Sequence, residues 1–79
     1  MSGHVRWIGR SFVLQEKLRA IKLSGGVEYL RIGTIVDVVG EKVMHVVTAE
    51  VEGRNQMIFA DELKKCGHEP EKPGDSQQP

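Results

Sequence analysis

The chain is 79 residues long, carries equal numbers of acidic and basic side chains, and has a single cysteine. That length allows one domain with a thin core, which disulfides, a metal or a partner chain usually reinforce. One cysteine excludes an internal disulfide, and no paired Cys-x-x-Cys spacing supports a zinc site. We therefore expect no metal or cofactor, and association either with further copies, as a homo-oligomer, or with another protein subunit.

Charge is unevenly divided along the chain. Residues 1–31 hold six basic and two acidic side chains, a net +4, and residues 32–79 hold five and nine, a net −4. The zero total argues against binding nucleic acid through bulk charge, but the basic half can form a local patch. No apolar run could span a membrane and none follows the N-terminus as in a secretory signal, so we expect a cytoplasmic protein.

The first 26 residues admit two interpretations. Residues 4–8 could form a strand with Val5 and Trp7 on one face. For residues 11–18 both helix and strand remain open, because three apolar residues fall at helical spacing, namely Leu14, Leu18 and Ile21. We expect a short helix or irregular turn over residues 11–17, and then a strand over residues 18–23. The turn at residues 24–26 would pair it with the strand beginning at Val27.

Alternation of apolar residues indicates one long strand up to Val38. Its predicted inward row consists of Leu30, Ile32, Thr34, Val36 and Val38. Gly33 lies within this run, where a glycine is typical of a bulge or sharp bend. Residues 39–42 then form a turn, in which Gly40 can take the positive φ that a hairpin needs.

Two further strands follow. Residues 43–52 alternate so that Val47, Ala49 and Val51 face the core. Residues 53–55 make a second turn, and residues 56–60 form a strand with Met57 and Phe59 as its inward pair. The pattern predicts a three-stranded antiparallel meander.

The domain is expected to close with a short helical turn. Asp61 is a suitable N-cap, and one turn, of the 3₁₀ type, would bring Leu63 onto the core. Residues 67–79 contain no apolar residue and are predicted to be disordered. The sequence therefore predicts a mainly β domain over residues 1–66, a small antiparallel barrel of four to five strands, followed by a tail.

Residues 18–65 resemble the SH3-like small barrels. The segment from Gly33 to Val43, a glycine, an apolar strand, a tight turn and an apolar strand, is similar to KOW-type domains. Sm-like RNA-binding proteins share the run from Gly33 to Asp37, although the second Sm signature is absent here. The segment from Phe59 to Leu63 looks like the end of accessory barrel subunits of photosystem I or ferredoxin-thioredoxin reductase. The resemblance to Sm-like proteins implies RNA binding, and the resemblance to the accessory subunits implies binding to proteins.

No motif predicts catalysis. Cys66 and His68 lack further metal ligands, and a role for Cys66 stays open. His45 has no nucleophile or carboxylate placed to work with it, although covalent catalysis needs such groups to converge. Gly25 and Gly26 are not followed by the Gly-Lys-Ser/Thr of a phosphate loop and are interpreted as a turn. We expect a binding module and not an enzyme.

The main binding hypothesis is a contact with RNA or single-stranded DNA through the basic half. Aromatic rings stack on bases while Arg and Lys hold the backbone. The predicted residues are Arg6, Arg10, Lys17, Arg19, Lys22, Tyr29 and Arg31. Trp7 and Phe12 lie among them, but a thin core also needs such rings, and we expect Trp7 in the core. The alternative is a protein–protein module using a strand edge or an apolar face with Met44 and Val46.

Overall fold

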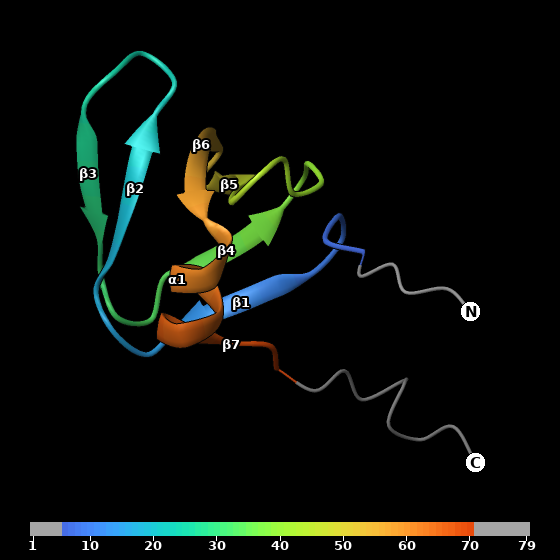
Figure 1. Ribbon diagram of the computed structural model, residues 1–79. Coiled ribbons are helices and arrows are strands. Elements are labelled where there is room, and N and C mark those ends of the chain that lie inside the picture. Colours follow the sequence, from blue (N-terminus) through green and yellow to red (C-terminus); the bar gives the residue numbers. More distant parts are fainter. Residues whose placement is uncertain (1–5, 71–79) are drawn as a thin grey trace.

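The protein is described by a computed structural model that covers residues 6–70 (Figure 1). In this part the chain forms seven strands and one helix: β1 (Ser11–Leu14), β2 (Leu18–Lys22), β3 (Val27–Leu30), β4 (Ile35–Val38), β5 (Val46–Val51), β6 (Arg54–Phe59), α1 (Ala60–Cys66) and β7 (Gly67–His68). The mainly β fold is confirmed. The predicted number of four to five strands is too low, because two segments expected to be a helix and a tail also pair as strands.

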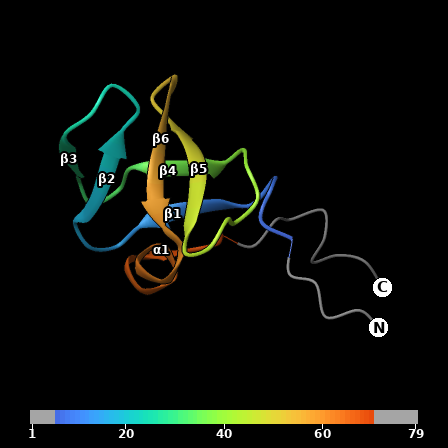
Figure 2. The same cartoon turned by 45° about the horizontal axis from the view of Figure 1, so that its top comes forward.

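All seven strands belong to one antiparallel sheet in the order β3-β2-β6-β5-β4-β1-β7. The sheet is not closed, since β3 and β7 each have a strand on only one side. It is strongly bent: β5 and β6 cross β4 and β1, and α1 lies beneath them (Figure 2). The hairpin of β2 and β3 stands out beside this body (Figure 1).

The core lies inside the bend of the sheet. Alternate residues along the strands point into it, as the pleat requires. The buried apolar residues are Trp7, Phe12, Leu14, Leu18, Ala20, Leu30, Val36, Val38, Val47, Ala49, Val51, Ile58, Ala60 and Leu63. The predicted row of Val47, Ala49 and Val51 is confirmed, as is the antiparallel meander of β4, β5 and β6.

The predicted long strand is interrupted. β3 ends at Leu30 and β4 begins at Ile35. Between them Thr34 N–H donates to Arg31 O, and Gly33 has a φ of 91°, a conformation that glycine adopts readily. Ile32 is therefore 70% exposed and not inward. The alternation continues across this break, which explains why the sequence suggested one bent strand.

The faces of β6 are the reverse of those predicted. Gln56 and Ile58 are buried, while Met57 and Phe59 are half-buried on the outer side. The hairpin turn consists of only two residues, Glu52 (φ 53°) and Gly53 (φ 82°), so that Val51 pairs with Arg54. A three-residue turn was expected, and a shift of one residue exchanges the two faces of a strand.

The N-terminal half is more extended than predicted. Residues 11–14 form β1 and not a helix, because they pair with β4 (Phe12 opposite Val36). The strand after residue 18 and its pairing with β3 are confirmed. Trp7 is buried, as expected, although it lies in a turn before β1; residues 4 and 5 of the predicted first strand lie outside the described part.

The C-terminal segment is a short α-helix followed by a strand. α1 has seven residues instead of one 3₁₀ turn, and its N-cap is Phe59, which places Asp61 in the first turn. Leu63 packs on the core, as predicted. β7 pairs with β1 beyond the expected boundary at residue 66, and residues 71–79 lie outside the described part. Within the described residues, no helix is long and apolar enough to cross a membrane.

Gln56 is expected to be a weak point of the core. It is 2% exposed, its Nε2 donates to Glu28 Oε1 at 3.2 Å, and its Oε1 has no partner among the described residues. An unpaired buried carbonyl costs about 1–3 kcal/mol. Replacement of Gln56 by leucine should therefore raise the free energy of unfolding by about 1 kcal/mol in urea denaturation. A loss of stability would mean that the bond to Glu28 outweighs the unpaired oxygen.

Candidate functional site

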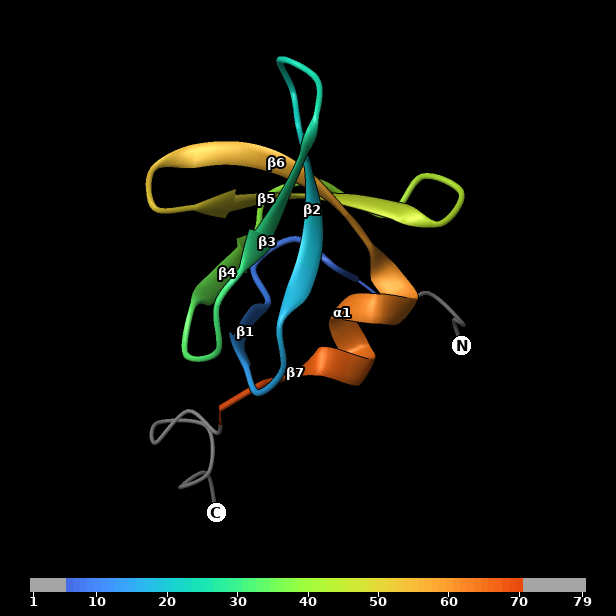
Figure 3. The same cartoon turned by 90° about the vertical axis from the view of Figure 1, so that its left-hand side faces the viewer.

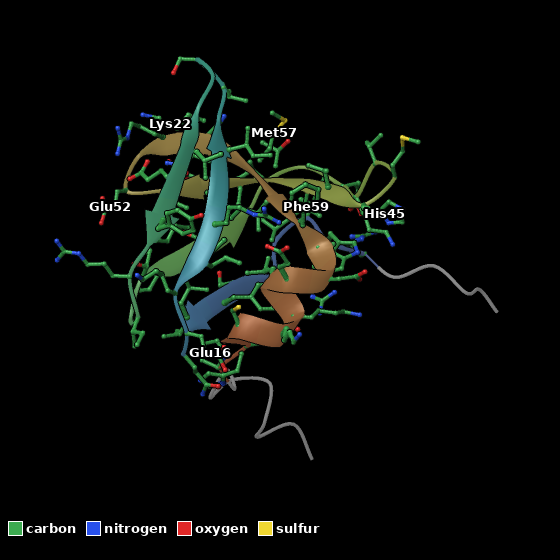
Figure 4. All side chains as sticks on the ribbon, turned by 60° about the vertical axis from the view of Figure 1, so that its left-hand side comes forward. Glu16, Lys22, His45, Glu52, Met57 and Phe59 are labelled. Atoms are coloured by element: carbon green, nitrogen blue, oxygen red, sulfur yellow. The ribbon has the colours of Figure 1, made fainter. Side chains whose placement is uncertain are left out.

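The basic residues predicted to bind nucleic acid lie in three separate places. Arg6 and Arg10 precede β1, near one edge of the sheet. Lys22 lies near the tip of the β2–β3 hairpin and pairs in register with Gln56 (Figure 4). The other four lie around the base of this hairpin, on its outer side: Lys17, Arg19, Tyr29 and Arg31. The structure therefore does not unite the seven residues into one surface.

Arg10 is engaged within the protein. Its Nε and Nη2 donate to the two carboxylate oxygens of Glu69 at 3.1 and 2.6 Å, and its guanidinium lies 4.5 Å from the centre of the Trp7 ring. The hydrogen bond to Glu69 raises the pKa of Arg10 above its usual value. Arg–carboxylate pairs of this two-pronged kind are among the stronger hydrogen-bonded contacts. A phosphate would have to displace Glu69 to reach Arg10.

Arg19 is occupied in a similar way. Its Nη2 lies 2.7 Å from Glu62 Oε2, and its guanidinium covers the ring of Phe59 at 5.3 Å. Lys17 and Arg31 have no carboxylate partner among the described ion pairs. Two unpaired cations remain beside Tyr29 at the hairpin base, which is a weak electrostatic site for a polyanion.

Of the candidate stacking rings, only Tyr29 is available. Trp7 and Phe12 are buried against each other, with ring centres 6.1 Å apart, and Lys64 Nζ lies 5.5 Å from the Trp7 ring. Tyr29 is 63% exposed, with Lys17 Nζ 6.0 Å from its ring. A base could therefore stack at one position of this surface, but not at a series of positions.

Above the basic residues at its base, the outer side of the hairpin is apolar. Ile21 lies opposite both Val27 and Met57, so an apolar row crosses three strands. The predicted apolar face around Met44 and Val46 is only partly formed. Val46 continues the outer side beside Phe59, whereas Met44 is 82% exposed at the tip of a separate turn, with a φ of 61°.

This apolar row ends at the free edge of β3; the sequence suggested a strand edge as a binding surface but did not indicate which strand. Lys22 N–H donates to Gly26 O at 3.0 Å, so the pair next to the turn is hydrogen-bonded. Hydrogen-bonded and non-bonded pairs alternate along an antiparallel ladder. Glu28 and Leu30 therefore bond to β2, while the N–H and C=O groups of Val27 and Tyr29 point away from the sheet.

The two edges of the sheet differ in their protection. β7 is two residues long and is followed by Glu69 and Pro70. Shortness, charge and proline are the usual devices that prevent an edge from pairing with another chain. β3 is twice as long, contains neither lysine nor proline, and exposes Val27 and Tyr29 on its outer side. Such an edge is competent to pair with a further strand.

A hollow lies beside the edge formed by β3. Its lining consists of Glu28, Tyr29, Leu30, Arg31, Thr34 and Glu52. The β3–β4 and β5–β6 turns lie on the same side of the molecule, at the left in Figure 3. Glu52 projects from the end of the β5–β6 hairpin (Figure 4). Glu28 is held by Gln56 and lies 3.9 Å from Arg54, while Glu52 makes no ion pair among the described contacts.

Of the remaining reactive side chains, His45 shares a hollow with Arg19, Phe59, Asp61 and Glu62, and Cys66 is a free thiol. Burial raises the pKa of the Cys66 thiol, with a further contribution from Glu16 and Glu62, which keeps it protonated and poorly nucleophilic at neutral pH. The described residues contain no group of three or more side chains able to hold a metal ion. Comparisons of this chain with family models, with curated proteins and with solved structures found no match.

Proposed function

We propose that this domain is a non-catalytic binding module that accepts a strand of a partner protein at the edge of β3. The observation that supports the proposal is the free edge itself, where the backbone groups of Val27 and Tyr29 have no partner in the sheet. Strand addition gains affinity from main-chain hydrogen bonds and specificity from alternate side chains. The exposed apolar side chains beside this edge supply surface that could select the side chains of the partner strand.

The proposal includes the expected setting of the domain. A small barrel of the SH3-like kind would arise only if an added strand bridged the two edges of the sheet, β3 and β7. We also propose that the protein is cytoplasmic, as the single cysteine suggests.

Replacement of Tyr29 by proline tests this function. The Tyr29 N–H is not used in the β2–β3 ladder, and proline is tolerated at such edge positions, so the fold should survive. Partner binding should be lost, because the added strand loses a donor and meets the proline ring. The matched control is Tyr29→Val, which keeps the N–H and an apolar side chain and should retain binding.

The measurement is affinity capture with the wild type and the two variants, followed by hydrogen exchange on the complex. The Val27 and Tyr29 amides should exchange rapidly in the free protein and slowly in the complex. Equal capture by the wild type and Tyr29→Pro would contradict the proposal, provided that circular dichroism shows both to be folded.

A second candidate function is contact with single-stranded nucleic acid at the hairpin base. It is favoured by the exposed Tyr29 ring between Lys17 and Arg31. Binding through these few cations would weaken as salt increases, with a small slope, and would be lost in Arg31→Ala. Salt-independent binding to a protein partner would exclude this candidate.

A further inference from the structure

We infer that the partner strand carries a basic side chain opposite Glu28, flanked by apolar residues opposite Val27 and Tyr29. The inference rests on the proposed function, because it describes the segment that would pair with β3. It excludes a second copy of β3 as the partner. The segment that pairs with β3 is an extended part of another protein with the consecutive residues apolar, basic and apolar.

The pleat of the sheet decides where each partner side chain points. Residues directly opposite each other in an antiparallel pair lie on the same face, with Cβ atoms about 4.5–5.5 Å apart. Val27 and Tyr29 point outward, so the partner residues opposite them meet exposed apolar side chains. Glu28 lies on the inner face with the buried Leu30, so the residue opposite Glu28 points toward the hollow beside β3.

The charges in this hollow favour a cation. Its lining contributes the carboxylates of Glu28 and Glu52 and the guanidinium of Arg31. Arg31 comes two residues after Tyr29 and so lies on the outer side with it, whereas Glu28 is on the inner face. Gln56 uses one oxygen of Glu28, and Arg54 lies only within 3.9 Å of the other. The lining alone has a net charge of −1, and the long contact with Arg54 leaves the Glu28 carboxylate able to pair with a lysine or arginine directly opposite it.

The same carboxylate opposes pairing of β3 with itself. If two copies of β3 paired in antiparallel fashion, the free backbone groups of Val27 and Tyr29 would all be hydrogen-bonded to each other only in one register. In that register Val27 of one copy lies opposite Tyr29 of the other. In that register Glu28 lies opposite Glu28 of the second copy, next to the two-fold axis. Like charges directly opposite each other in an antiparallel pair are destabilising. The domain should therefore remain unpaired at this edge until a strand with the complementary charge is present.

Two capped peptides test the inference. Both are short, rich in valine and identical except at the central position, which is lysine in one and glutamate in the other. The lysine peptide should bind wild-type protein about tenfold more tightly in calorimetric titration at low salt. Glu52→Lys, which changes an exposed turn residue, should reduce this preference, and Glu28→Lys should reverse it in favour of the glutamate peptide.

The outcomes separate the inference from the proposed function. If both peptides bind equally and Tyr29→Pro abolishes both interactions, strand addition stands and the inferred basic residue is wrong. If neither peptide binds, or if binding survives in Tyr29→Pro, the proposed function fails together with the inference. Dimerisation of the free domain through β3, detected as protected Val27 and Tyr29 amides at high concentration, would also overturn the inference.

Discussion

Replacement of Ile58 by alanine is expected to lower the free energy of unfolding by about 3 kcal/mol. Ile58 is fully buried on the inner face of β6, opposite Val47. Removing most of a buried isoleucine loses its transfer free energy and leaves a cavity, at a typical cost of about 2–5 kcal/mol. Small domains are stable by only about 5–15 kcal/mol, so this loss should be apparent in urea denaturation monitored by circular dichroism.

The neighbouring Met57 is the matched control, because it has a similar size and lies on the outer face. Met57→Ala should cost less than about 1 kcal/mol, since its side chain is only half-buried. If Ile58→Ala fails to fold, Ile58→Val should still cost about 0.5–1.5 kcal/mol. A larger loss for Met57 than for Ile58 would restore the register that the sequence alone predicts and contradict the two-residue turn at Glu52.

Replacement of Trp7 by alanine should destabilise the domain to a similar extent, by about 3–5 kcal/mol. The ring is 4% exposed, packs against Phe12 and lies beneath Arg10 and Lys64. The backbone N–H of Trp7 donates to Glu41 Oε1 at 2.9 Å, a bond that Trp7→Ala would keep, so the loss measures the side chain alone. Thermal unfolding followed by far-ultraviolet circular dichroism measures the effect without relying on tryptophan fluorescence.

Tyr29 provides the contrast for this experiment. Tyr29→Ala removes an aromatic side chain that is mostly exposed, so we expect the free energy of unfolding to change by less than about 0.5 kcal/mol. If Trp7 were an exposed ring that stacks on bases, Trp7→Ala would change the free energy of unfolding as little as Tyr29→Ala. Equal effects on stability would therefore remove Trp7 from the core.

The sequence predicted the strands better than their connections. Alternation alone located β4, β5 and β6, because the period of a strand is two residues whatever its neighbours are. The faces of β6 were wrong because Glu52 occupies a positive φ that favours glycine or asparagine, so the composition of the turn did not reveal its length. The break after Leu30 was missed because Ile32 keeps the apolar rhythm although it is exposed.

The candidate site could be predicted only in part. Tyr29 and Arg31 were recognised as neighbours of an exposed surface from their alternation. The carboxylates that occupy Arg10 and Arg19 come from Glu69 and Glu62, which are 59 and 43 residues away along the chain. Such pairs depend on the folded arrangement and leave no local pattern. The free edge of β3 is likewise a property of strand order, which propensities do not determine.

The inequality of the two sheet edges limits how far any assembly can grow. A fibre or ring built by strand addition needs two competent edges on each unit, so that every copy can be both donor and acceptor. Here β7 is short and is followed by Glu69 and Pro70, whereas β3 is longer and has a free edge. Addition should therefore stop after one event, which fixes a stoichiometry of one partner segment per domain and keeps the complex finite at any concentration.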